Sequence, residues 1–166
     1  MNHVAVRQDV HALANRVVRA PDEFAPTDEA TSVFLAGGIT NCEPWQKRLA
    51  ALLAARVDDL VVIDPRRETY DAVAAEQIEW EHRHLRLSTA ISFWFTATSV
   101  QPMALYELGA WSMTKKPIFV GVERGYEREL DVRVQTKLAR PDVVVVDDLV
   151  ALAGQIAAWA KGEREG

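Results

Sequence analysis

The chain has 166 residues, of which 49% are hydrophobic and 26% are charged, and its formal net charge is -5. These proportions are close to those of globular proteins and do not favour a disordered or fibrous chain. Acidic and basic residues are interspersed, so the broad positive surface that binds polymeric nucleic acid is not expected. The length suits a single domain with a sizeable core.

The cysteine content and the apolar runs limit the environment of the protein. Cys42 is the single cysteine, which excludes an internal disulfide framework and a cysteine-rich zinc site. The first 30 residues show no export signal, and no run approaches the roughly 18 apolar residues that span a bilayer. The sequence therefore predicts a cytoplasmic protein without a membrane partner.

The N-terminal segment differs from the rest of the chain. A weakly amphipathic stretch at 9–20 precedes a segment at 21–31 that is rich in proline and acidic residues. Such a composition is typical of a linker. We expect residues 1–30 to form an accessory arm and residues 31–166 to form one α/β domain.

From residue 32 onward, predicted strands and helices alternate. Short apolar runs predict strands at 32–38, 60–64, 90–95, 116–122 and 142–147. Helical spacing predicts helices at 44–57, at 75–88, from Pro102 onward, at 129–139 and at 148–163. The last helix is expected to begin at a cap formed by Asp147 or Asp148.

The strands are almost continuously apolar, which indicates that both faces of their sheet are covered. The pattern therefore predicts a doubly wound α/β domain. Such sheets bind ligands beyond the C-terminal ends of their strands. We expect the site in the segments that follow four of the predicted strands, at 37–40, 64–67, 96–101 and 121–126.

Glycines and arginines mark two of these segments. Gly37 and Gly38 would let backbone amides approach a ligand closely, although a plain turn at the end of a strand is an equal explanation. Arg66 and Arg67 follow the second predicted strand. A guanidinium there would bind a carboxylate or phosphate, and the alternative is a turn with solvated charges.

Histidines and tryptophans give weaker indications. His82 and His84 lie among glutamates, but a separation of two places them on different sides of a helix, so no metal site is expected and no cofactor is required. Trp45 and Trp94 lie near the ends of strands. They would either stack on a planar base or, as is more common for tryptophan, fill the core.

Glu107 is the strongest candidate for a reactive group. It lies about a turn and a half inside the helix that begins near Gln101 and Pro102, close to the amide-rich end that favours negative charge. Its neighbours Leu105 and Leu108 are apolar. An inward-pointing Glu107 would be a carboxylate in a dry cleft, and a surface glutamate is the alternative.

Seven segments occur together in a recognisable order. They are "VFLAGGIT...W" at 33–45, "IDPRR" at 63–67, "QIEWE" at 77–81, "ISFWF" at 91–95, "PMALYELG" at 102–109, "KPIFVGVERGYERELDV" at 116–132 and "VQTKL" at 134–138. In this order they resemble the nucleoside 2-deoxyribosyltransferase-like family from about residue 32 to about residue 150. The resemblance implies a flavodoxin-like, five-stranded parallel sheet of order 2-1-3-4-5 with helices on both faces. It also implies a homo-oligomer, dimeric or larger.

The same resemblance implies roles for individual residues. Glu107 would be the nucleophile and Glu81 the second acidic group, which protonates the leaving base or orients the nucleophile. Gly109 would let the helix of Glu107 pack closely. Further residues would surround the substrate, with Asp131 at the rim. The substrate-binding set is Gly37, Gly38, Thr40, Asp64, Arg67, Gln77, Phe95 and Tyr126.

The function that follows is cleavage or transfer of the N-glycosidic bond of a 2'-deoxynucleoside or its monophosphate. The reaction would pass through a glycosyl-enzyme intermediate without a metal. Two alternatives stay open. One is a non-catalytic module that binds or senses a nucleotide, because fold does not determine function. The other is hydrolysis of a nicotinamide-type glycosidic bond.

Overall fold

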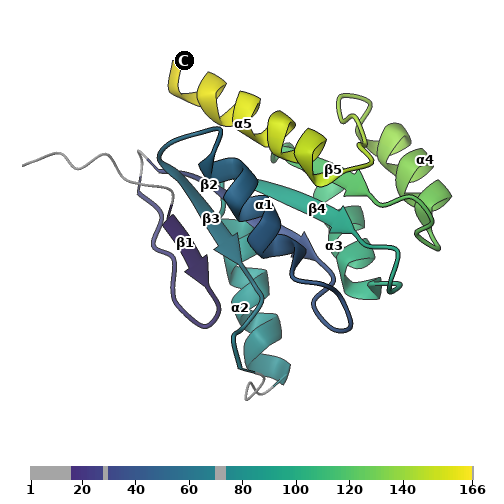
Figure 1. Ribbon diagram of the computed structural model, residues 1–166, viewed down its shortest axis with the longest axis horizontal. Helices are drawn as coiled ribbons and strands as arrows, with labels where there is room; N and C mark the ends of the chain where they lie inside the picture. The colour runs from purple at the N-terminus through teal and green to yellow at the C-terminus, as the bar shows by residue number, and fades with distance from the viewer. Residues whose placement is uncertain (1–15, 28–29, 70–73, 166) are drawn as a thin grey trace, which may run out of the picture.

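The computed structural model describes residues 16–27, 30–69 and 74–165. These residues form a five-stranded, entirely parallel sheet and five helices (Figure 1). The strands are β1 (Arg16–Arg19), β2 (Thr31–Gly37), β3 (Leu60–Asp64), β4 (Ala90–Phe95) and β5 (Ile118–Val122). The helices are α1 (Trp45–Ala54), α2 (Ala74–Leu87), α3 (Pro102–Ser112), α4 (Glu129–Ala139) and α5 (Leu149–Glu165).

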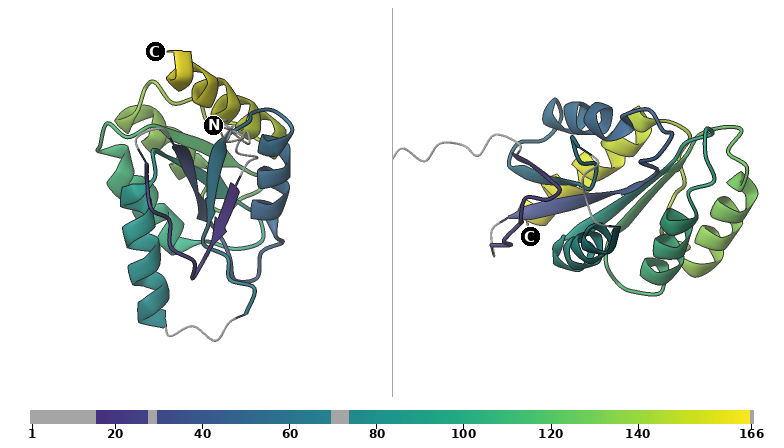
Figure 2. Two further views of the ribbon diagram at one scale, coloured as in Figure 1. Left: turned by 90° about the vertical axis from the view of Figure 1, so that its left-hand side faces the viewer. Right: turned by 90° about the horizontal axis from the view of Figure 1, so that it is seen from below.

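The helices cover both faces of the sheet. Figure 2 shows α1 and α5 on one face and α2, α3 and α4 on the other. This three-layer arrangement confirms the predicted doubly wound, flavodoxin-like α/β fold.

Each face of the sheet has its own hydrophobic core. In β2, Val33 and Leu35 pack with α1 and α5, whereas Phe34 and Ala36 pack against the opposite helices. All four side chains are at most 1% exposed. Because successive residues of a strand point to opposite faces, a strand covered on both sides has no solvent-facing positions, which explains the nearly continuous apolar runs.

The order of the strands is β1-β3-β2-β4-β5. The prediction counted β2 as its first strand, so the run β3-β2-β4-β5 is the predicted order 2-1-3-4, and the full predicted order 2-1-3-4-5 differs from the sheet only at its two edges. Residues 16–19, which the sequence places in an amphipathic stretch, add a parallel strand to the outer edge of β3. The apolar run at 142–147 forms a single bridge, between Gly121 and Val146, in place of a full strand. Its Val144 is 67% exposed, so high hydrophobicity alone did not bring this segment into the sheet.

The segment after β1 is attached to α2. The indole Nε1 of Trp80 donates to the carbonyl of Asp22 at 3.0 Å, and the backbone N–H of Phe24 donates to Nε2 of His84 at 3.1 Å. Phe24 is only 4% exposed. Part of the segment before residue 31 is thus packed on the sheet, and a separate accessory role for residues 1–30 stays a prediction that reaches outside the described residues.

The helix α5 begins at a side-chain cap. Oδ1 of Asp148 accepts a hydrogen bond from the backbone N–H of Ala151 at 2.8 Å, which confirms Asp148 as the cap. In the part of the chain that the structure describes, no helix combines the length and the apolar composition needed to cross a membrane.

Candidate functional site

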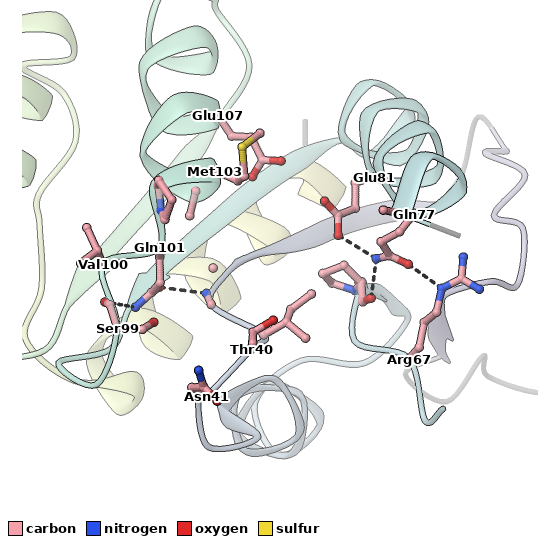
Figure 3. A pocket seen from close by; sticks show the side chains of 17 residues that line it. Thr40, Asn41, Arg67, Gln77, Glu81, Ser99, Val100, Gln101, Met103 and Glu107 are labelled. Carbon is pink, nitrogen blue, oxygen red and sulfur yellow. Dashed lines mark hydrogen bonds between the residues drawn. The ribbon is translucent and has the colours of Figure 1, made fainter. Parts of the chain in front are cut away.

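A cavity of about 580 Å³ opens at the C-terminal edge of the sheet (Figure 3). The neighbouring strands β2 and β4 lead to helices on opposite faces, α1 and α3, so the cavity lies where the winding reverses. Its walls are formed by 37–41, by Pro65 and Arg67, by Ala74, Gln77 and Glu81, and by 99–104 together with Glu107. Its volume is that of a site for a small molecule.

Two carboxyl groups face this cavity from different helices. Glu81 lies on α2 and Glu107 lies on α3, and Figure 3 shows both side chains pointing into the space between these helices. The surface alternative for Glu107 is therefore excluded. Among the described residues, none donates a hydrogen bond to the Glu107 carboxyl or forms an ion pair with it.

Burial changes the acidity of both groups. The loss of solvent, reinforced by the charge of Glu81, raises the pKa of Glu107 to about 8. Burial also raises the pKa of Glu81, but a hydrogen bond from Gln77 and the charge of Arg67 act in the opposite direction. The two carboxyls share one cavity and have different surroundings.

Gln77 and Arg67 connect Glu81 to the loop after β3. Nε2 of Gln77 donates to Oε1 of Glu81 at 2.7 Å and to the carbonyl of Pro65 at 2.9 Å. Nε of Arg67 donates to Oε1 of Gln77 at 2.5 Å, and its NH2 group donates to Glu76 at 3.1 Å. The predicted site residues Arg67, Gln77 and Glu81 thus form one chain of hydrogen bonds.

Gly37 and Gly38 line the cavity, and packing explains why glycine is needed at both positions. A Cβ on Gly37 would lie 2.4 Å from the carbonyl oxygen of Trp94 and 2.5 Å from Cζ2 of Trp45. A Cβ on Gly38 would lie 2.4 Å from Sγ of Cys42 and 2.8 Å from Cδ of Gln101. The protein's own atoms therefore fill the space beside both glycines.

Trp45 and Trp94 belong to the core. Trp45 is fully buried beneath the loop at 37–43, here called the glycine loop, and its Nε1 donates to the carbonyl of Gly38 at 2.9 Å. Trp94 is 5% exposed and packs in the same core. Of the two alternatives for these tryptophans, the core-filling one is confirmed.

Gln101 was expected at the start of a helix and within the site segment 96–101, and the structure gives it a specific part in the site. Its Oε1 accepts from the Gly38 N–H at 2.8 Å, while its Nε2 donates to the carbonyls of Thr96 and Ser99 at 2.9 and 3.1 Å. It lines the cavity and adopts a left-handed conformation with φ 53°. One buried amide therefore joins the loops that follow β2 and β4.

Arg66 holds the glycine loop from the other side. Its NH2 group donates to the carbonyls of Cys42 and Glu43 at 3.3 and 3.2 Å, and its Nε donates to Gln46 at 3.0 Å. Arg66 does not line the cavity, whereas the adjacent Arg67 does. The two consecutive arginines thus have different surroundings.

Several predicted substrate contacts lie away from the cavity. Asp64 is buried and accepts hydrogen bonds from the Arg66 N–H and the Arg19 side chain. Phe95 packs in the core against Tyr126, with ring centroids 5.3 Å apart. The Tyr126 hydroxyl donates to the carbonyl of Val100 and so supports the cavity wall. Among these described residues, none is part of the lining.

Two further residues singled out in the sequence lie outside the cavity. Asp131 is exposed and forms an ion pair with Arg128 at 3.0 Å. Gly109 is also exposed, and a Cβ there would meet nothing within 4 Å, so the expectation that it permits close packing of α3 is wrong. Across the described ranges, no group of three or more His, Cys, Asp or Glu side chains could hold a metal ion.

The remaining cavity residues had little signal in the sequence. Thr40, which was predicted, lines the cavity together with Asn41, Ser99, Val100 and Met103. Ser99 and Val100 fall within a segment that was singled out because it follows a strand. Asn41 and Met103 lie just beyond such segments, and only the path of the loops brings them to the cavity.

A family model matches most of the described chain. The family model described as "Nucleoside 2-deoxyribosyltransferase like" matches residues 30–126, more than half of the 166-residue chain. Among curated proteins, no sequence matches the chain. The matched region contains all the cavity residues, and it indicates an enzyme with a nucleoside deoxyribosyltransferase-like function and a small-molecule nucleoside as its partner. The chain belongs to the nucleoside 2-deoxyribosyltransferase-like family.

Proposed function

We propose that the protein cleaves or transfers the N-glycosidic bond of a 2'-deoxynucleoside or its 5'-monophosphate, with Glu107 as the nucleophile. The observation that carries this proposal is the position of Glu107 and Glu81 on the wall of one cavity, at the ligand-binding edge of the sheet. Paired carboxyl groups on either side of a sugar are the usual means of glycosidic bond cleavage.

The reaction requires one proton for the two carboxyl groups. The ionised oxygen of Glu107 forms a bond to the anomeric carbon while the bond from that carbon to the base nitrogen breaks. The electron pair of the broken bond stays on the base, which accepts the proton carried by the carboxyl pair. A second base or a water molecule then attacks the anomeric carbon and releases Glu107.

The walls of the cavity suit a nucleoside. Ile39, Val100 and Met103 offer apolar surface for a planar base, while Thr40 and Asn41 offer hydrogen bonds for sugar hydroxyls. Within the described part of the lining, Arg67 is the one cation, and Glu76 partly neutralises it. This charge pattern favours an uncharged nucleoside over a monophosphate.

Base release tests the proposal directly. The protein is incubated with each 2'-deoxynucleoside and its 5'-monophosphate, with and without a free acceptor base, and the products are separated by chromatography. We expect base release or exchange from the wild type and at least about 100-fold less from Glu107→Gln, since the nucleophile is lost. Glu79→Gln, at an exposed position of α2, is the matched control and should retain full activity.

The outcome separates the alternatives. Release of nicotinamide from its dinucleotide, without turnover of deoxynucleosides, would assign the protein to the nicotinamide-type hydrolases. Thermal stabilisation by nucleosides without any turnover would instead support a binding module. Full activity of Glu107→Gln would contradict the nucleophile assignment.

A further inference from the structure

The two carboxyl groups of the cavity differ in their hydrogen-bond donors. Glu81 receives an N–H from Gln77 at 2.7 Å, whereas no described residue donates to Glu107. Two interacting carboxyls lose their protons in two steps, and the surroundings decide which one keeps the second proton. The hydrogen bond from Gln77 to Glu81 therefore influences which of the two carboxyls keeps the second proton.

Arg67 determines the orientation of the Gln77 amide. A guanidinium has only donors, so the atom of Gln77 that lies 2.5 Å from Nε of Arg67 must be the amide oxygen. The NH2 group of Gln77 is then turned the other way, and its two hydrogens are used by Pro65 and Glu81. A reversed amide would place NH2 against the guanidinium and an oxygen against the carboxyl of Glu81.

The charged groups around the two carboxyls favour an ionised Glu81 and a protonated Glu107. From the loop after β3 comes the positive Arg67, from α2 come Glu76 and Glu81, and from α3 comes Glu107. Glu76 is mostly exposed, so its effect is screened by solvent. The loops after β2 and β4 contribute no charged side chain to the described lining.

We propose that Arg67 and Gln77 are positioning residues, which hold Glu81 as the ionised member of the pair and leave the shared proton on Glu107 in the free protein. Arg67 acts through Gln77, by fixing its amide, and only Gln77 contacts Glu81. The elevated pKa of Glu107 agrees with this assignment. The catalytic consequence rests on the proposed function: the proton that reaches the base starts on Glu107, which becomes the nucleophile by losing it.

The experiment follows the two carboxyl groups separately and does not depend on turnover. The full chain is labelled with carbon-13 at the glutamate carboxyls, and the two signals are assigned with Glu81→Gln and Glu107→Gln. The titration midpoints are then measured by NMR in the wild type, Gln77→Met, Arg67→Met and the double variant. Gln135→Met, at an exposed position of α4, is the matched control, and thermal unfolding verifies that each variant is folded.

We expect the Glu107 midpoint to lie above that of Glu81 in the wild type. Gln77→Met should raise the Glu81 midpoint by about one pH unit, the scale of a lost hydrogen bond to a carboxylate. Arg67→Met should raise it less, and should add little in the double variant because the two residues act in series. Gln135→Met should leave both midpoints unchanged.

Two results would overturn the inference: a wild-type Glu81 midpoint above that of Glu107, or a Glu81 midpoint that does not move in either Gln77→Met or Arg67→Met. Base release is measured on the same variants. Shifted midpoints in a protein without turnover would refute only the proposed function. Turnover with unshifted midpoints would refute only the positioning role.

Discussion

Gln101 accepts a hydrogen bond from the backbone N–H of Gly38 at 2.8 Å, across 63 positions of the sequence. This bond joins the loop after β2 to the loop after β4, and both loops line the cavity. The amide of Gln101 also donates to the carbonyls of Thr96 and Ser99, so a single side chain fixes the wall opposite Glu81.

Removal of the Gln101 amide should destabilise the protein. Gln101→Ala leaves the Gly38 N–H buried without a partner, and we expect a loss of about 1–3 kcal/mol in the free energy of unfolding. Gln101→Gly loses the same bonds but relieves the left-handed conformation, so it should be about 1 kcal/mol more stable than Gln101→Ala. Urea denaturation measures both. Equal stability of the two variants would contradict the strained conformation.

Alanine should have opposite effects at two glycines. Gly37→Ala places a Cβ 2.4 Å from the Trp94 carbonyl oxygen. It should lower the free energy of unfolding by at least about 1–3 kcal/mol, the usual cost of overpacking, because a backbone atom cannot move aside easily. Gly109→Ala meets nothing within 4 Å on an exposed face of α3, and should stabilise the protein by about 1 kcal/mol. Thermal unfolding compares them. A neutral Gly37→Ala would show that the loop can move.

Arg66 should matter for the order of the glycine loop. Arg66→Met removes the hydrogen bonds to the carbonyls of Cys42 and Glu43, so amide hydrogen exchange within 38–43 should become at least about tenfold faster. Lys47→Met, at an exposed position of α1, is the control and should leave that exchange unchanged. Unchanged exchange in Arg66→Met would mean that Trp45 and Gln101 suffice to hold the loop.

Stability should depend on pH through Glu107. Its pKa is about 8 in the folded protein and near the ordinary value of 4.5 in the unfolded chain, so the folded state binds the proton more tightly. The resulting stabilisation is complete below about pH 4.5 and is lost as the pH rises toward 8. Glu107→Gln lacks this dependence. The free energy of unfolding of the variant minus that of the wild type should therefore be larger at pH 8.5 than at pH 5, by at least about 1 kcal/mol.

The rate of base release should fall above about pH 8. Above the pKa of Glu107 both carboxyls of the free protein are ionised, and the pair has no proton for the leaving base. The pH profile of kcat/KM reports the ionisations of the free enzyme and is the quantity to measure. A profile that stays level up to pH 10 would indicate that the proton for the base comes from elsewhere.

The layers of the fold could be predicted from the sequence because their signals are local. Apolar runs identified β2, β3, β4 and β5, and helical spacing identified all five described helices. Two features of the fold could not be predicted, and the reason is the same for both. The pairing of β1 with β3, and the exposure of Val144, depend on which neighbours the finished sheet provides, and a local pattern contains no information about them.

The site shows a similar division. Glu81, Gln77 and Arg67 were expected beside the substrate, and all line the cavity. The segment 96–101 was expected at the site, but the hydrogen bonds of Gln101 could not be predicted because its partner Gly38 becomes a neighbour only through the parallel pairing of β2 with β4. Asp64 and Phe95 are the last residues of β3 and β4, close to the segments that line the cavity, yet both side chains are buried in the protein.

The pairing of β1 with β3 has a practical consequence for anyone who expresses this protein. The family model begins at residue 30, after β1 and after Phe24, which packs on α2. A chain that begins at residue 30 would leave β3 as an exposed edge strand, with backbone N–H and C=O groups that β1 no longer pairs. Exposed edge strands can pair with strands of other chains. Such a truncated protein should therefore aggregate on expression more than the longer chain does.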